Sequence, residues 1–175
     1  MHSRCPMNHD ALRSPLPIIS IFLHMPAGGP PLQFERREEL ARVAQQRGFT
    51  RGAELGVRTG DFAVVNLANW PSATDYLLVD LWEAQENYHD ASNYGSEQQN
   101  KNLQITLRKT RPFKRTVRVC RNYTSACVLT EADSYFDFIY VDARHDYLGV
   151  KEDLESWWPK LRPGGVICPP RVWAV

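Results

Sequence analysis

Alternation of apolar runs with helical stretches, sustained over most of the chain, constrains the fold more than any other feature. The apolar runs with strand character are residues 53–57, 76–81, 116–120, 136–142 and 166–168. The segments with helical character are residues 34–47, 61–69, 97–109, 124–131 and 147–161. Continuous apolar strands are typical of parallel sheets that are buried on both faces. We therefore predict an α/β fold with a doubly wound, mostly parallel sheet of about five strands between two layers of helices, a three-layer α/β/α arrangement.

The composition indicates one ordinary globular domain that follows an irregular N-terminal segment. Six of the twelve prolines fall within residues 1–32, which predicts a disordered or extended tail there and a folded domain over residues 33–175. Apolar residues make up 43% of the chain and the net charge is +1, which excludes a strongly basic or strongly acidic protein.

The N-terminal segment and the cysteines bear on the compartment. No apolar run approaches the roughly 20 residues that a membrane-spanning helix needs, and the N-terminal run covers only residues 16–25. We expect a cytoplasmic protein without a membrane segment, although organelle targeting or secretion by the tail stays open. The cysteines form no CxxC pair and match no zinc pattern, so we expect four reduced thiols in a reducing compartment: Cys5, Cys120, Cys127 and Cys168.

Polar residues at the ends of the predicted strands are the candidate functional residues, because doubly wound sheets bind ligands at the carboxyl ends of their strands. The first strand runs into Gly56 and Gly60, which allow a sharp turn and a close approach of a ligand to the next helix. The second ends in Asp80, whose carboxylate can accept hydrogen bonds from a ribose diol. The fourth ends in Asp142, followed by His145, and this pair can deprotonate a hydroxyl, bind a divalent metal or hold a charged substrate.

Each of these residues also has a plainer explanation. The glycine spacing fits a tight turn, and Asp80 fits a solvated loop acid. His145 fits a residue at the entry of a helix that hydrogen-bonds its own loop. Asp146 lies directly before a helix, where an acid is an ordinary N-cap.

Three segments in a fixed order give the chain a resemblance to a known family. They are AELGVRTG at 53–60, YLLVDLW at 76–82 and FDFIYVDARHDYLGVKEDLESWWPKLRPGGVI at 136–167. Together they resemble class I Rossmann-like methyltransferases that depend on S-adenosylmethionine (SAM), and methyltransferase family 24 most closely. The resemblance covers about residues 36–168. Its most specific piece is the third segment, where Asp-Ala-x-His-x-Tyr, an amphipathic helix and Leu-x-Pro-Gly-Gly-Val-Ile follow one strand.

The resemblance implies a place for each matching residue around the cofactor SAM. The cofactor-binding residues that it implies are Glu54, Gly56, Val57, Arg58, Gly60, Asp80, Leu81, Trp82, Tyr123, Thr124 and Asp142. The glutamate and glycines after the first strand would surround the methionine part. Asp80 would hold the ribose hydroxyls, and the residues after the second and third strands would lie at the adenine. Asp142 would lie near the sulfonium and the methyl acceptor, and His145 would be the general base, so these two are the catalytic candidates.

The C-terminal residues depart from the family pattern. After the Pro-Gly-Gly turn the family continues with an acidic or His-Asp-Tyr strand end, a helix and a hairpin, whereas residues 168–175 read CPPRVWAV. The resemblance therefore implies a domain truncated after its fifth strand, with the C-terminal hairpin missing. A divalent metal at Asp142 would then lack a further ligand, which leaves metal binding undetermined. The sheet would also have an exposed edge, which favours a homodimer.

Three functions stay open on this sequence. The favoured one is transfer of a methyl group from SAM to a hydroxyl of a small-molecule acceptor. The second is a truncated paralogue that binds SAM without catalysis. The third is an RNA methyltransferase that would use the basic stretch 101–121, although the scarcity of aromatic residues there disfavours nucleic acid. Four aromatic residues fit either an acceptor pocket or the cap of a core: Trp70, Trp82, Tyr88 and Tyr94.

Overall fold

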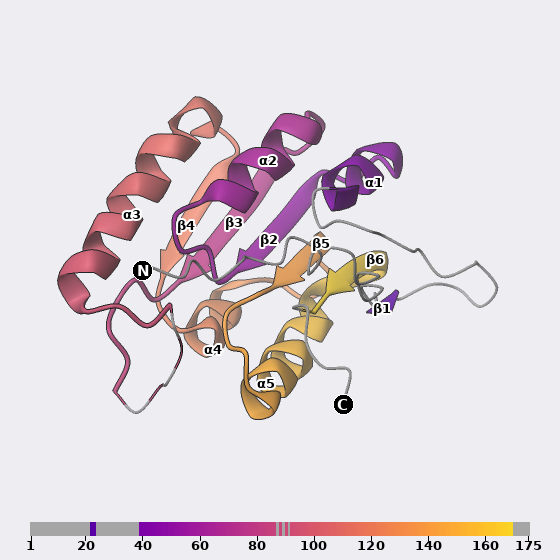
Figure 1. Cartoon of the computed structure of the whole chain (residues 1–175). Helices are drawn as coiled ribbons and strands as arrows, with labels where there is room; N and C mark the ends of the chain where they lie inside the picture. Colours follow the sequence, from indigo (N-terminus) through magenta and orange to yellow (C-terminus); the bar gives the residue numbers. More distant parts are fainter. Residues whose placement is uncertain (1–21, 24–38, 87, 89, 91, 170–175) are drawn as a thin grey trace, which may run out of the picture.

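The protein forms a mixed sheet with helices packed on both of its faces (Figure 1). A computed structural model describes residues 22–23, 39–86, 88, 90 and 92–169. The strands are β1 (Phe22–Leu23), β2 (Arg51–Leu55), β3 (Asp75–Asp80), β4 (Val117–Arg121), β5 (Phe136–Val141) and β6 (Leu161–Cys168). The helices are α1 (Leu40–Gln46), α2 (Asp61–Asn69), α3 (Ser96–Thr110), α4 (Thr124–Cys127) and α5 (Tyr147–Trp157). None of the helices in these ranges is both long and apolar enough to cross a membrane.

The order of the strands confirms the predicted doubly wound sheet. It runs β1-β6-β5-β2-β3-β4, and the five strands from β2 to β6 are parallel to their neighbours. Each parallel crossover passes through a helix, as βαβ units require. The chain leaves β2 toward β3 on one side and later returns to β5 on the other, so the topological switch point lies between β2 and β5.

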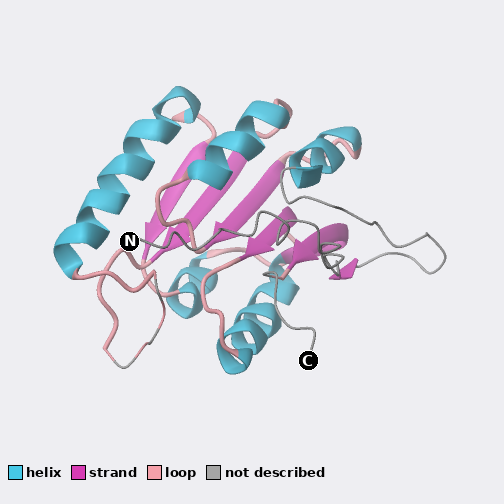
Figure 2. Ribbon diagram, in the orientation of Figure 1, coloured by secondary structure: helices cyan, strands magenta, loops and turns pink. Residues whose placement is uncertain are grey.

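Two separate cores explain why the strands read as unbroken apolar runs. Helices α1, α2 and α3 cover one face of the sheet and α4 and α5 cover the other (Figure 2). Because side chains alternate along a strand, Tyr76 and Leu78 of β3 pack under the first group of helices, whereas Leu77 and Val79 pack under the second. Both faces of the sheet are therefore buried, which requires apolar residues at consecutive positions.

The strand β6 differs from the sequence prediction. The prediction had a helix up to Leu161, a turn at 163–165 and a strand only from Val166, but β6 begins at Leu161. It pairs with β5 through Phe136 to Leu161 and Phe138 to Val166, so the extra residues form an irregularity in the register. The Pro-Gly-Gly segment thus lies within the strand, at this irregularity.

The edge of the sheet beside β6 is not bare, contrary to the expectation that favoured a homodimer. The short strand β1 pairs with it antiparallel, Phe22 with Ile167 and Leu23 with Val166. Residues 22–23 belong to the segment that was predicted to be an irregular tail, and the rest of residues 1–32 lies outside the described ranges. Backbone groups of β6 that would be open to another chain are therefore partly satisfied within this chain.

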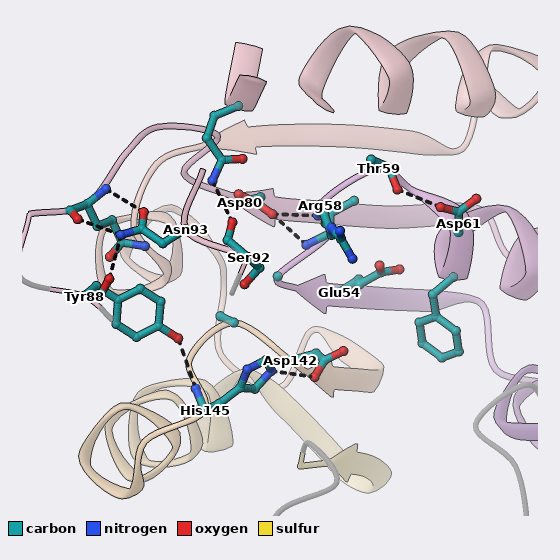
Figure 3. A pocket seen from close by; sticks show the side chains of 16 residues that line it. Glu54, Arg58, Thr59, Asp61, Asp80, Tyr88, Ser92, Asn93, Asp142 and His145 are labelled. Carbon is teal, nitrogen blue, oxygen red and sulfur yellow. Dashed lines mark hydrogen bonds and ion pairs between the residues drawn. The ribbon is translucent and has the colours of Figure 1, made fainter. Parts of the chain in front are cut away.

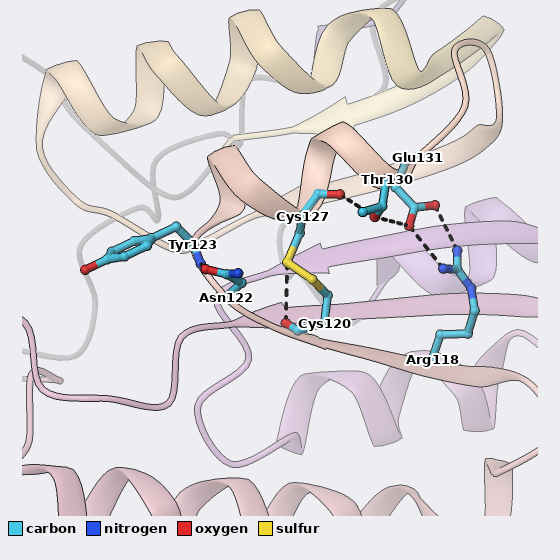
Figure 4. The surroundings of a disulfide bond; sticks show 7 residues. All are labelled: Arg118, Cys120, Asn122, Tyr123, Cys127, Thr130 and Glu131. Carbon is cyan, nitrogen blue, oxygen red and sulfur yellow. Dashed lines mark hydrogen bonds and ion pairs between the residues drawn. A yellow bond between two sulfur atoms is a disulfide. The ribbon is translucent and has the colours of Figure 1, made fainter.

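The expectation of four reduced thiols is wrong for one pair. Cys120, in β4, and Cys127, in α4, form a disulfide across the strand–helix loop, with Cα atoms 6.1 Å apart (Figure 4). Cys168 is a free, buried thiol whose pKa is raised by burial. The two half-cystines are seven residues apart in sequence, and the turn from β4 into α4 brings them together. The cysteines therefore no longer support a reducing compartment.

Candidate functional site

A cavity of about 260 Å³ opens at the carboxyl ends of β2, β3 and β5, beside the topological switch point. Crevices at this place are where doubly wound sheets bind ligands. Its lining includes seven of the predicted cofactor-binding and catalytic residues, several of them drawn in Figure 3: Glu54, Gly56, Val57, Arg58, Asp80, Asp142 and His145. These residues come from three strand ends that are up to about ninety positions apart in the chain.

Gly56 holds two strand ends in contact at the floor of this cavity. Its N–H donates to the carbonyl of Val79 at 2.8 Å, and the N–H of Asp142 donates to the carbonyl of Leu55 at 2.7 Å. A Cβ atom on Gly56 would lie 2.3 Å from the carbonyl oxygen of Asp142, and its φ is +85°. Only glycine fits both the left-handed backbone and the close approach.

Asp80 organises the loop that follows β2. One carboxylate oxygen accepts the backbone N–H groups of Val57 and Arg58, each at 2.8 Å, and the other accepts that of Trp82 at 2.8 Å. A carboxylate has about four acceptor sites, so three are used within the protein. Asp80 can therefore accept about one further strong hydrogen bond. It cannot accept two further hydrogen bonds, one on each oxygen.

The backbone of Arg58 is held in an unusual conformation. Its φ is +54°, which is uncommon for a residue other than glycine. Its carbonyl accepts hydrogen bonds from the indole of Trp82 at 2.8 Å and the hydroxyl of Thr106 at 3.1 Å. Its guanidinium donates to the hydroxyl of Tyr94 at 2.7 Å. The loop after β2 is therefore fixed from three sides.

Glu54 is a buried carboxylate on the cavity wall. Only 1% of its surface is exposed, and it accepts a hydrogen bond from the hydroxyl of Tyr76 at 3.1 Å. Burial, and then the charge of Glu54, raises the pKa of Tyr76 well above its usual value, so Tyr76 stays a donor. Glu54 therefore adds a buried carboxylate to the cavity wall.

Acidic side chains outnumber basic ones in the described lining of the cavity. The carboxylates there belong to Glu54, Asp61, Asp80 and Asp142, and the guanidinium to Arg58. A hydrogen bond from Lys109 lowers the pKa of Asp61, which keeps that carboxylate ionised. The excess of negative charge favours a cationic ligand.

His145 lines the cavity beside Asp142 (Figure 3), and Asp90 lies at its other ring nitrogen. Its Nδ1 is 3.0 Å from Asp90 and its Nε2 is 3.3 Å from Asp142. Its backbone N–H donates to the hydroxyl of Tyr88 at 3.4 Å. Burial lowers the pKa of His145, but the hydrogen bonds and charges of Asp90 and Asp142 outweigh burial and raise it above 6.5.

The loop between β3 and α3 supplies residues that sequence reasoning missed. Asp90 is one of them, and its pKa is lowered to about 2 by hydrogen bonds from the hydroxyl and backbone N–H of Ser92. Asn93 of the same loop also lines the cavity, as does Tyr88, which the sequence offered as either a pocket or a core residue. This segment has no periodicity, so nothing in the sequence indicated which of its polar residues would face His145.

Some predicted cofactor residues lie away from this cavity. Tyr123 and Thr124 line a separate hollow with Arg144 and Asp153, and Tyr123 is half exposed. Burial raises the pKa of Asp153 to about 6.

Three more of those residues support the loops instead of lining the cavity. Trp82 is fully buried, Gly60 is the left-handed N-cap of α2, and Leu81 offers its carbonyl to Arg121 at 3.4 Å. Of the aromatic residues that fitted a pocket or a core, Tyr88 lines the cavity, Tyr94 contacts Arg58, and Trp70 is buried in the core.

Asp146 is the N-cap of a helix. Its carboxylate accepts the N–H of Gly149 at 2.8 Å and caps α5, which confirms the N-cap explanation. No group of three or more His, Cys, Asp or Glu side chains within the described ranges is arranged to hold a metal ion.

Ion pairs neutralise part of the basic stretch 101–121. Lys101 pairs with Glu97, Lys109 pairs with Asp61, and Arg118 pairs with both Asp75 and Glu131. Arg121 donates to the carbonyl of Trp82 at 2.9 Å. Half of the eight basic residues in this stretch therefore bind groups of the protein itself.

The fold and site together define the class of this protein as a Rossmann-like α/β domain with a ligand crevice at its switch point. A family model described as a methyltransferase domain matches residues 53–168, which is most of the chain. The chain therefore belongs to this methyltransferase family, and it has the class I fold of SAM-dependent methyltransferases.

Two solved structures and one curated protein are similar to parts of this chain. An O-methyltransferase from Bacillus cereus, in complex with SAH, aligns with a TM-score of 0.57 and 19% identity over 82% of this chain and 58% of its own. TomG from Streptomyces achromogenes, an O-methyltransferase involved in tomaymycin synthesis and solved with SAM, aligns with a TM-score of 0.56 and 15% identity over 75% of this chain and 53% of its own. The uncharacterized protein y4gI of Sinorhizobium fredii is 37% identical over 95 residues, 54% of this chain and 10% of that protein.

Proposed function

We propose that this protein transfers a methyl group from SAM to a hydroxyl group of a small molecule. The observation that carries the proposal is the acidic cavity at the switch point. Its lining includes the Gly56 turn, the buried Glu54 and Asp80, whose carboxylate accepts backbone N–H groups of the loop after β2. Family membership supports the reaction class. Two structural relatives, O-methyltransferases solved with SAH and with SAM, support the cofactor and the hydroxyl acceptor.

The residues of the cavity fit SAM as a cofactor. The carboxylate of Glu54 would hold the ammonium of its methionine part, beside the Gly56 turn that lines the same cavity. Asp80 would accept one ribose hydroxyl at its remaining acceptor site. When bound, SAM supplies an electrophilic methyl group on a positively charged sulfur, which suits the excess of carboxylates.

His145 would act as the general base for the acceptor. It lies on the cavity rim next to Asp142, and its raised pKa makes it a stronger base once it is deprotonated. A positioned base contributes roughly 10²–10⁴-fold to rate, and positioning of the acceptor contributes more. Asp142 lies 3.3 Å from Nε2 of this imidazole and lines the same cavity.

A protein that binds the cofactor without turnover is the second candidate. The chain spans less than three fifths of the length of the solved relatives and a tenth of y4gI. The ion pairs of Lys101, Lys109 and Arg118 give no support to the RNA alternative.

Calorimetry with SAM and SAH tests the cofactor assignment. The chain should bind both, and Asp80→Ala should weaken binding about 10- to 100-fold, since a hydrogen bond to a charged group contributes roughly 1.5–3 kcal/mol. Asp133→Ala is the matched control, because Asp133 is an exposed acid that pairs with Lys160 away from the cavity. A folded wild-type chain that binds neither compound would refute the proposal.

Turnover is then measured with methyl-labelled SAM and a panel of phenols, catechols and sugars. Label transfer to one class of acceptor, lost in His145→Gln, would support the enzyme. Cofactor binding with no label transfer to any acceptor would favour the inactive alternative. Salt-sensitive binding of RNA would favour the third function.

A further inference from the structure

His145 has a partner that the sequence did not indicate, at a distance of 55 positions along the chain. Asp90, from the loop between β3 and α3, places a carboxylate oxygen 3.0 Å from Nδ1. Tyr88 of the same loop accepts the backbone N–H of His145 at 3.4 Å. Two contacts from one loop therefore fix both the backbone and the ring of His145.

The structure also holds Asp90 in place. The backbone N–H of Ser92 donates to Asp90 Oδ1 at 2.7 Å, and the hydroxyl of Ser92 bonds the same oxygen, which leaves Oδ2 for His145. Asn93 ties the two ends of the loop, accepting the N–H of Gln85 at 2.9 Å and donating to the carbonyl of Tyr88 at 2.7 Å. The carboxylate of Asp90 is thus oriented before any ligand binds.

Two carboxylates compete for the single proton of a neutral imidazole. Asp142 is 3.3 Å from Nε2, whereas Asp90 is 3.0 Å from Nδ1, at the usual length of an N–H···O bond. The shorter contact favours the proton on Nδ1. Nε2, on the side of Asp142, then carries the lone pair, and Asp142 itself lines the cavity.

We infer that Asp90 is a positioning residue that holds the proton of neutral His145 on Nδ1, so that Nε2 faces the acceptor as the base. The inference rests on the proposed methyl transfer. In the step concerned, the O–H bond of the acceptor breaks, its proton passes to Nε2, and its electron pair stays on the oxygen. Asp90 acts through the imidazole and keeps its own charge, in the way that a third group orients the base of a nucleophile–base pair.

The position of the ring proton can be measured without an acceptor. In the ¹⁵N-labelled full chain, long-range ¹H–¹⁵N spectra at about pH 9, where an unperturbed imidazole is neutral, distinguish a protonated from an unprotonated ring nitrogen. The chain has five histidines, and the signals that vanish in His145→Gln identify this one. The wild type should carry its proton on Nδ1, and Asp90→Ala should move it to Nε2.

Two further variants make the result decisive. Asp90→Asn is nearly isosteric and should shift the same signals in the same direction if Asp90→Ala fails to fold. Asp133→Ala removes a distant carboxylate and should change nothing. A wild-type proton on Nε2, or an unchanged Nδ1 proton in folded Asp90 variants, would overturn the inference.

Measurements of turnover and of SAM binding distinguish a failure of this inference from a failure of the proposed function. With any acceptor found in the panel, Asp90→Ala should lower kcat at least about tenfold, within the roughly 10²–10⁴-fold that a base contributes, and leave the Kd for SAM unchanged. An unchanged kcat would refute the role of Asp90. Failure of the wild type to bind SAM would refute the proposed function alone, since the ring-proton measurement would still decide what Asp90 does.

Discussion

Replacement of Gly56 by alanine tests how closely the ends of β2 and β5 approach. The new Cβ would lie 2.3 Å from the carbonyl oxygen of Asp142 and 2.6 Å from Cα of Ala143, both of them backbone atoms that cannot rotate away. Overpacking of this kind costs about 1–3 kcal/mol, and a left-handed backbone costs alanine a further 1–2 kcal/mol, roughly. We expect Gly56→Ala to lower the free energy of unfolding by about 2–5 kcal/mol, a large part of the roughly 5–15 kcal/mol of a typical domain.

Gly48→Ala is the matched control for the backbone contribution. Gly48 also has a positive φ, +66°, but nothing lies within 4 Å of its added Cβ. It should lose only the roughly 1–2 kcal/mol of the left-handed conformation. Urea unfolding followed by tryptophan fluorescence, with equal m-values, compares the two variants. Equal losses would refute the argument that the strand ends are in contact, whereas an excess loss in Gly56→Ala, together with weaker SAM binding, would support it.

Three further predictions concern the disulfide and the histidine. Since half-cystines seven residues apart close a short loop, changing Cys120 and Cys127 to alanine should cost about 2.5 kcal/mol in urea unfolding without reductant; no loss would contradict a stabilising bond. The raised pKa of His145 means that its imidazolium adds stability below about pH 6.5, which is lost as pH rises through the folded-state pKa. His145→Gln should therefore cost more at about pH 5.5 than at about pH 8.5, and equal costs would refute this. Asp90→Asn and Asp142→Asn should each lower the pKa of His145 in an NMR titration, and an unchanged value in both would show that the carboxylates do not set it.

Local periodicity predicted most of the elements because burial repeats with the pitch of each element. Helix α2 was predicted over 61–69 and occupies Asp61–Asn69, and β3, with four consecutive buried residues, was displaced by a single position. The Gly56 turn, Asp80 and Asp142 could be singled out since strand ends in a doubly wound sheet share one edge. The start of β6 was predicted five residues too late because Pro-Gly-Gly is typical of a turn, whereas here it lies within the strand at an irregularity of the register.

Pairings between distant side chains had no comparable signal. Asp90 and His145 are brought together by a loop without periodicity, and Cys120 and Cys127 by the angle between a strand and the helix after it. Trp82 follows a strand end, where the resemblance implied an adenine contact, yet its indole is buried against the Arg58 carbonyl.

The sequence by itself determined the class of fold and the acidic strand ends, because both depend on burial patterns within a few residues. The tertiary structure alone decided that Asp80 uses most of its hydrogen-bonding capacity on the backbone of the loop after β2. It also decided that His145 lies between Asp90 and Asp142. These contacts depend on how loops from separate crossovers meet in space, and the spacing of residues along one segment cannot predict that arrangement.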